Sequence, residues 1–151
     1  MRRPLIVFLG GGIGASLRAL LLLWLAPWGA VLPAPVLVAN VLGAFVLGLV
    51  FVLADEAGLL RAETRLFLAV GVLGGFTTFS TFGWGADQLL ARGAVGAALI
   101  YLGSSLVGGV VGVTAGLAMA RALASTPRAR RGNALADVAS IEAEGREESR
   151  S

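Results

Sequence analysis

The chain contains 151 residues, of which 57% are hydrophobic and only 14% are charged, and its mean hydropathy is +0.86. About a quarter of the residues of a soluble domain are charged, so this composition excludes an ordinary soluble domain and indicates a membrane protein. The absence of cysteine and histidine excludes disulfides, thiol chemistry and the commonest metal ligands. The formal net charge of +3 is spread along the chain without a basic aromatic patch, which argues against nucleic-acid binding.

Four apolar segments are long enough to cross a bilayer, which requires about 20 residues of helix. The charge-poor stretch between Arg3 and Asp55 contains two such lengths, divided by a cluster of proline and glycine, and two later stretches contain one each. The sequence therefore predicts an all-α membrane protein with four transmembrane helices, at residues 5–25, 35–53, 66–89 and 95–120.

Two parts of the chain differ in composition. Residues 1–124 form the predicted four-helix membrane subunit, whereas residues 125–151 are polar and predict a disordered cytoplasmic tail. Arginine favours the cytoplasmic side of membrane proteins, and the distribution of arginine predicts that both termini are cytoplasmic. The cytoplasmic arginines would be Arg2, Arg3, Arg61, Arg65, Arg121, Arg128, Arg130 and Arg131, against Arg92 alone on the other side.

The first span contains a charged residue, Arg18, near its middle. A guanidinium at that depth costs about 2.5–3.5 kcal/mol on insertion scales, so it has to face other helices, water or a bound anion. Two interpretations stay open. Arg18 either forms an anion-attracting vestibule or caps backbone carbonyl groups at a helix break.

The second span contains one strongly polar residue, Asn40, in an apolar surrounding. Its amide either holds helices together by hydrogen bonds or donates to an anion in a pore. From this residue alone, the contact between helices is the favoured interpretation.

The third span contains the string GGFTTFSTF at residues 74–82, which is a poor membrane helix. Paired glycines followed by hydroxyl residues predict a break at mid-membrane. Broken backbone at that depth is tolerated where it is buried in protein or lines a cavity, and its carbonyl groups can hold a cation there.

The same string supplies a polar path for a small anion. Phe79 and Phe82 are three residues apart, so both rings can face one side of a helix. The positive edge of an aromatic ring favours a small anion without the full charge that would trap it. The hydroxyl groups of Thr78, Ser80 and Thr81 complete the predicted path.

Three strings in order, GGIGASLR at 11–18, NVLGAFVLG at 40–48 and GVLGGFTTFSTF at 71–82, resemble the Fluc/CrcB family of bacterial fluoride channels over residues 4–122. The resemblance implies a channel rather than an enzyme, which exports cytoplasmic fluoride passively across the inner membrane and so relieves fluoride toxicity. It also implies a dual-topology architecture, in which two subunits assemble antiparallel in the lipid bilayer around two fluoride pores.

The resemblance assigns roles to individual residues. It implies pore positions at Asn40, Phe79 and Phe82, and a polar track on the fourth span at Tyr101 and Ser105. It also implies a central structural Na⁺ ion, held by backbone carbonyl groups of Gly74 and Thr77 from both subunits. The chain departs from the family pattern at Pro35-Val36 in place of Gly-Thr, at Gly85 in place of an acid and at Gly109 in place of a serine.

The arginine bias leaves the partner open, because a subunit that inserts both ways carries almost no bias. The predicted assembly is therefore either a homodimer or a heterodimer with an oppositely oriented paralogue. A small multidrug transporter is the alternative function, since it also has four short spans. Such exchangers need a carboxylate within the membrane, and here the nearest acid, Asp87, lies at the end of a span.

Overall fold

The computed structural model of the chain describes residues 2–28 and 32–124, which are helical apart from short connections. In chain order the elements are α1 (Arg2–Leu25), the 3₁₀ turn η1 (Ala26–Trp28), α2 (Ala34–Phe51), the π-helical η2 (Val52–Glu56), α3 (Ala62–Arg65), the π-helical η3 (Leu66–Leu73), α4 (Gly74–Phe76), α5 (Phe79–Ala91) and α6 (Val95–Ala124).

These elements combine into four helices that are long and apolar enough to cross a membrane, at Arg2–Trp28, Ala34–Glu56, Ala62–Ala91 and Val95–Ala124. Each predicted span lies within one of them, so the prediction of four spanning segments is confirmed. The chain is an all-α, multi-pass membrane protein. The predicted tail at 125–151 lies outside the described residues.

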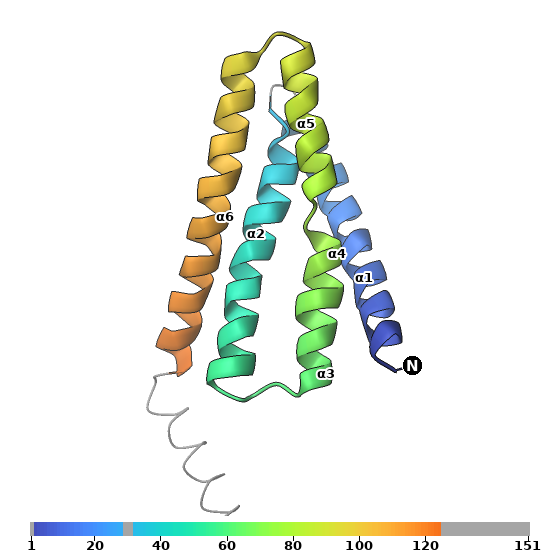
Figure 1. Cartoon of the computed structure of the whole chain (residues 1–151), viewed down its shortest axis with the longest axis vertical. Coiled ribbons are helices and arrows are strands. Elements are labelled where there is room, and N and C mark those ends of the chain that lie inside the picture. The colour runs from blue at the N-terminus through green and yellow to red at the C-terminus, as the bar shows by residue number, and fades with distance from the viewer. Residues whose placement is uncertain (1, 29–31, 125–151) are drawn as a thin grey trace, which may run out of the picture.

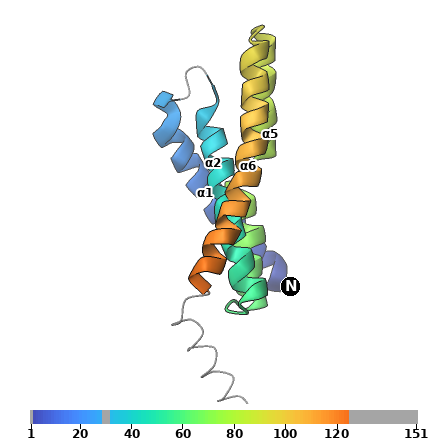
Figure 2. The same ribbon diagram turned by 90° about the vertical axis from the view of Figure 1, so that its left-hand side faces the viewer.

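The third span occupies the centre of the arrangement together with α2. Figure 1 shows α2 between α6 and the third span, with α1 on the far side of the third span. Figure 2 shows that α5 and α6 rise together, whereas α1 and the beginning of α2 lean away from them. The N-terminus, α3 and the C-terminal end of α6 lie at the same end of the molecule (Figure 1).

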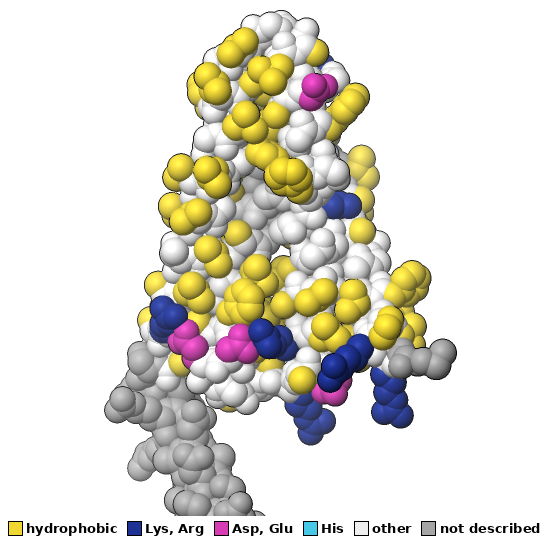
Figure 3. Space-filling model, viewed as in Figure 1, with side chains coloured by type: hydrophobic (Ala, Val, Ile, Leu, Met, Phe, Trp, Pro, Cys, Tyr) yellow, Lys and Arg dark blue, Asp and Glu magenta, His cyan; other side chains and the backbone are white. Residues whose placement is uncertain are grey.

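Charged side chains gather at this end (Figure 3). Asp55 pairs with Arg65 at 3.2 Å, and Glu56 accepts hydrogen bonds from Arg121, including one of 2.9 Å from Nε. The connection between α2 and α3 is thereby tied to the C-terminal end of α6. Because these side chains are about half exposed, the ion pairs orient the connection more than they stabilise the fold.

The backbones of α1 and η3 touch directly because glycine stands at the contact. Gly10 and Gly14 are buried on α1. A Cβ on Gly10 would lie 2.8 Å from the Phe67 carbonyl oxygen, and a Cβ on Gly14 would overlap the carbonyl oxygen of Val72. Small residues allow such an approach in lipid, where no hydrophobic force draws helices together. The contact brings Arg18, one turn beyond Gly14, to the end of α4.

A second contact of the same kind joins α6 to α2. A Cβ on Gly112 would lie 2.8 Å from the Val41 carbonyl oxygen, and a Cβ on Gly116 would overlap that of Phe45. Gly109 has no such neighbour within 4 Å. Most of the contact between α2 and α6 therefore involves one face of α6, while much of the remaining surface of α6 is exposed.

We predict that Gly14→Ala weakens the packing of α1. The new methyl group would overlap the Val72 carbonyl oxygen, which belongs to the backbone and cannot rotate away. Overpacking of this kind costs about 1–3 kcal/mol, so the unfolding temperature of the detergent-solubilised protein should fall. Gly12→Ala is the matched control, because nothing lies within 4 Å of a Cβ at that position. Equal unfolding temperatures for the two variants would contradict this packing.

Candidate functional site at the break in the third span

The third span is interrupted at Thr77 and Thr78. Both residues are extended, with φ/ψ of −80°/157° and −150°/121°, between the end of α4 and the start of α5. In a continuous α-helix the Thr78 N–H would donate to the Gly74 carbonyl oxygen. That bond is absent, because the Thr78 N–H donates elsewhere. The carbonyl of Gly74 is thus left without its usual helical donor.

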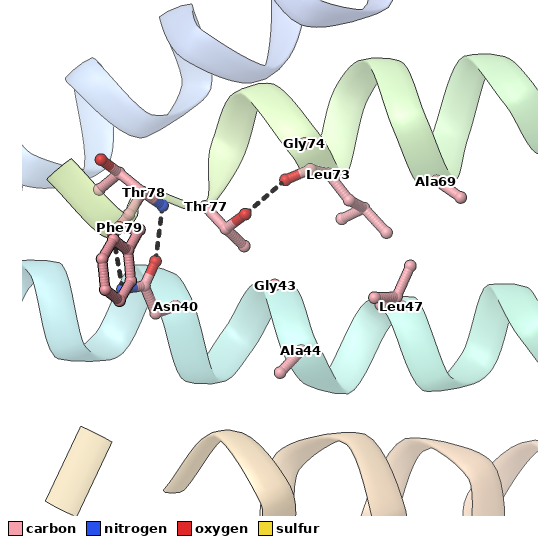
Figure 4. Close-up of a pocket in the computed structure, with 10 residues that line it drawn as sticks. All are labelled: Asn40, Gly43, Ala44, Leu47, Ala69, Leu73, Gly74, Thr77, Thr78 and Phe79. Atoms are coloured by element: carbon pink, nitrogen blue, oxygen red, sulfur yellow. Dashed lines mark hydrogen bonds between the residues drawn. The ribbon is translucent and has the colours of Figure 1, made fainter. Parts of the chain in front are cut away.

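Asn40 of α2 takes over both backbone groups of Thr78. Its Oδ1 accepts a 2.8 Å hydrogen bond from the Thr78 N–H, and its Nδ2 donates a 3.0 Å bond to the Thr78 carbonyl oxygen. Figure 4 shows both bonds across the gap between α2 and the third span. The amide therefore joins two helices, as the favoured interpretation of Asn40 requires. One of its two Nδ2 hydrogens remains for another acceptor.

The hydroxyl group of Thr78 starts α5. Thr78 is the N-cap residue, and its Oγ1 accepts a 3.2 Å hydrogen bond from the Thr81 N–H. It also donates to Thr81 Oγ1 at 3.1 Å and lies 3.2 Å from Ser80 Oγ. The three hydroxyl residues that the sequence singles out thus form one cluster at the first turn of α5, with Thr78 buried and Ser80 exposed.

Arg18 lies on the other side of the break. Its Nη1 donates a 3.1 Å hydrogen bond to the carbonyl oxygen of Thr77, the C-cap residue of α4. This is the contact that a capping arginine would make, and it places a positive charge at the C-terminal end of η3 and α4, where the helix dipole is negative. The Thr77 N–H donates the ordinary helical hydrogen bond to the Leu73 carbonyl oxygen at 3.0 Å, and its Oγ1 donates to the same oxygen at 3.0 Å.

An open cavity of about 350 Å³ lies between α2 and the third span at this level. Figure 4 shows its lining, with α2 along one side and η3, α4 and the break along the other. The lining residues are Asn40, Gly43, Ala44, Leu47, Ala69, Leu73, Gly74, Thr77, Thr78 and Phe79. Five of them were not predicted: Gly43, Ala44, Leu47, Ala69 and Leu73. The spacing of Gly43, Ala44 and Leu47 from Asn40 at helical intervals is the signal that could have found those on α2.

A second cavity, of about 460 Å³, shares Leu47 and Ala69 with the first and extends along α2 toward the charged end. Arg65 lines it, with its guanidinium carbon 5.9 Å from the centre of the Phe51 ring. The two cavities together follow α2 from the charged end to the break. Arg65 was predicted only as a loop charge and not as a residue of this path.

An aromatic series continues from the break along α5 to α6. The ring centres of Phe79 and Phe82 are 5.6 Å apart, and those of Phe82 and Tyr101 are 5.3 Å apart, with tilted planes in both pairs. The prediction that the two phenylalanines face the same side is confirmed. Phe79 is 82% exposed, so most of its ring lies open at the surface of the subunit.

Two buried hydroxyl groups on α6 lack a hydrogen-bond partner. Tyr101 is 1% exposed, and neither its hydroxyl nor Ser105 Oγ has a partner within the described residues. The two residues are one helical turn apart and therefore lie on one face of α6. An unpaired buried hydroxyl is costly, which indicates that something outside the subunit's own side chains satisfies these groups.

The carbonyl groups at the break fit a cation only in part. The Gly74 carbonyl lacks its helical donor, and the Thr77 carbonyl keeps one lone pair beside its bond to Arg18. Two such oxygens are fewer than a hard cation binds in proteins. No group of three or more His, Cys, Asp or Glu side chains that could hold a metal ion occurs in the described parts of the chain.

Comparison with known proteins places the chain in a family. The sequence profile described as "CrcB-like protein, Camphor Resistance (CrcB)" matches residues 5–117. A "Fluoride-specific ion channel FluC" from Methylobacterium nodulans is 41% identical over 121 residues, which cover 80% of this chain and 98% of that protein.

Two further relatives with the same name are similarly close. The protein from Rhodospirillum centenum is 43% identical over 80% of this chain and 97% of its own length. That from Thermus thermophilus is 47% identical over 74% of this chain and 87% of its own length. With the profile and these relatives covering nearly all of the described residues, the chain belongs to the CrcB-like family.

Proposed function

We propose that this chain is one subunit of a fluoride-selective channel in the bacterial inner membrane, which exports cytoplasmic fluoride passively and so relieves its toxicity. The observation that carries the proposal is the broken third span, with its two extended threonines held by Asn40. The name shared by the three relatives supports fluoride as the transported ion.

The break supplies groups of opposite polarity. The first amide groups of α5 have no acceptor within the helix and carry a positive partial charge, which suits an anion. The carbonyl groups at the end of α4 carry a negative partial charge, which suits a cation. Broken helices in transporters use their two ends in this way. A break of this kind near the middle of the bilayer would be within reach of ions from both sides of the membrane.

The aromatic series and the hydroxyl groups form the proposed pore wall. The ring edges of Phe79 and Phe82 would replace part of the hydration shell of fluoride without trapping it. Asn40 would donate its remaining Nδ2 hydrogen, and the hydroxyl cluster of Thr78, Ser80 and Thr81 would line the entrance to α5. Tyr101 and Ser105 would donate their unpaired hydroxyl hydrogens along α6.

Arg18 and Arg65 would draw anions toward the break. Arg65 lines the cavity nearer the charged end, and Arg18 lies beside the break, with one of its five N–H groups used by Thr77. Basic residues along a cleft with low-dielectric walls raise the local concentration of an anion. The proposed roles of Arg18 as cap and as vestibule are therefore compatible.

A structural Na⁺ ion would be held by the carbonyl groups of Gly74 and Thr77. One subunit offers two carbonyl oxygens, so a second copy or an oppositely oriented paralogue is needed to complete the ligands. The ion would neutralise the carbonyl ends of two broken helices where they meet. In this assembly the exposed ring of Phe79 would be covered by the partner.

A four-helix multidrug transporter is the alternative function, and the position of the acidic residues weighs against it. The acids in the described part of the chain are all exposed: Asp55, Glu56, Glu63 and Asp87. Asp55 and Glu56 form ion pairs at the charged end, and Asp87 lies near the end of α5. None of them is a buried carboxylate of the kind that couples proton and substrate movement.

Fluoride efflux from proteoliposomes tests the proposed function and its site. The wild-type protein should release trapped fluoride, whereas Asn40→Ala and Phe79→Ile should each slow the release by at least about tenfold, equivalent to about 1.4 kcal/mol. Phe8→Ile on the outer face of α1, where the ring is 75% exposed, is the matched control and should keep the wild-type rate. Efflux that is insensitive to both site variants would refute the assignment of the pore.

Removal of sodium should destabilise the assembled protein. When Na⁺ is replaced by a large organic cation at constant ionic strength, the Gly74 and Thr77 carbonyl groups of the two subunits lose the ion that they share, and only Arg18 remains beside Thr77. The unfolding temperature and the dimeric fraction in detergent should then both fall. If both values are the same in the two media, the chain has no structural sodium site.

The orientation of the chain should be uniform. Because the sequence contains no cysteine, single cysteines introduced as Leu59→Cys and Gly96→Cys report the two ends of the bundle without background. In cells, a membrane-impermeant thiol reagent should label position 96 and not position 59, which would favour a heterodimer with a paralogue. Antiparallel dimers formed by the purified chain alone, active in fluoride efflux, would show that it is a homodimer instead.

A further inference from the structure

The beginning of α2 meets α5 and α6 at a glycine. Gly85 is buried on α5, and a Cβ added to it would lie 2.8 Å from Pro33 Cγ and 3.1 Å from Pro33 Cβ. The same Cβ would lie 3.4 Å from the hydroxyl oxygen of Tyr101. The proline ring therefore fills the volume that any side chain at position 85 would take.

Only glycine fits at position 85 while Pro33 keeps its place. A carboxylate at position 85 would collide with Pro33, and it would accept a hydrogen bond from the Tyr101 hydroxyl. Asp87 does not replace it, because its side chain is exposed. Neither Gly85 nor Pro33 has a side-chain acceptor for the Tyr101 hydroxyl, and Pro33 also lacks a backbone N–H.

Tyr101 belongs to a hydrophobic core cluster. Its neighbours in the core are Ala86, Leu89 and Ala98, with Leu32, Leu37 and Phe82 packed against them. The hydroxyl is fully enclosed yet has no partner in the described residues. A buried polar group without a partner is retained where a ligand or ordered water supplies one.

We infer that Pro33 and Gly85 form a volume-matched seal over the Tyr101 hydroxyl, which closes this end of the hydroxyl track to water and reserves the hydroxyl for the permeating anion. The inference rests on the proposed fluoride function. Pro33 and Gly85 are positioning residues in this scheme, since neither offers the anion a side-chain donor. The seal depends on the sum of the two side-chain volumes and not on either residue alone.

Exchanging volume between the two positions tests the seal. Gly85→Ala pushes the proline ring away, and Pro33→Ala removes Cγ and Cδ and leaves a gap. Each single variant should reduce fluoride efflux by at least about fivefold. The double variant Pro33→Ala/Gly85→Ala refills the gap and should recover to within about twofold of the wild-type rate. Gly83→Ala on the same helix, where nothing lies within 4 Å, should have no effect.

Variants made in a protein that lacks the Tyr101 hydroxyl distinguish a loss of efflux caused by hydration of the hydroxyl from one caused by altered packing. In Tyr101→Phe, neither single variant should reduce fluoride efflux further, because no hydroxyl remains to be hydrated. Further loss in that background would overturn the inference, as would a double variant no better than the worse single one. Normal efflux in both single variants would overturn it as well.

Unfolding temperatures test the contact between Pro33 and Gly85 without a transport measurement. The same volume exchange should lower the unfolding temperature in each single variant and restore it in the double variant. If the wild-type protein carries no fluoride, the proposed function fails, while this thermal cycle still decides whether Pro33 and Gly85 form a matched contact. Additive losses of unfolding temperature in the double variant would show that they do not.

Discussion

Two hydrogen bonds between the Asn40 amide and the backbone of Thr78 are the interaction on which the rest of the site depends. A backbone N–H or carbonyl group without a partner costs several kcal/mol in the interior of a membrane, so a spanning helix breaks only where its freed groups are satisfied. A side-chain amide carries both a donor and an acceptor and can satisfy both groups of one residue. Once Thr78 is held in this way, its hydroxyl is free to cap α5.

The other side of the break is balanced by Arg18. The first half of the third span ends with carbonyl groups that have no helical donor, and the Arg18 guanidinium donates to that of Thr77. The contact exists because α1 approaches the third span at Gly10 and Gly14, which brings the next turn of α1 level with Thr77. A charged side chain that is costly in an isolated helix is thus used to stabilise an interruption that would be costly by itself.

The break is satisfied from α1 and α2, but some other polar groups of the subunit lack a partner within the described residues. The Thr81 N–H is capped by Thr78 Oγ1, whereas the carbonyl of Gly74 lacks its helical donor and the hydroxyl groups of Tyr101 and Ser105 have no partner within the described residues. The ring of Phe79 at the break is exposed and leaves this face of the subunit uncovered. A single copy leaves that face open, which is the physical reason for proposing a second subunit.

The sequence by itself determined the four spans and the interrupted helix, because hydrophobic length and a string such as GGFTTFSTF are local properties. It also determined the family, and it singled out Arg18, Asn40 and the aromatic residues. Only the tertiary structure decided their partners: that Asn40 bonds Thr78, that Arg18 caps Thr77, and that Pro33 faces Gly85. These pairs are separated by tens of residues and depend on how closely the helices approach, which no local pattern encodes.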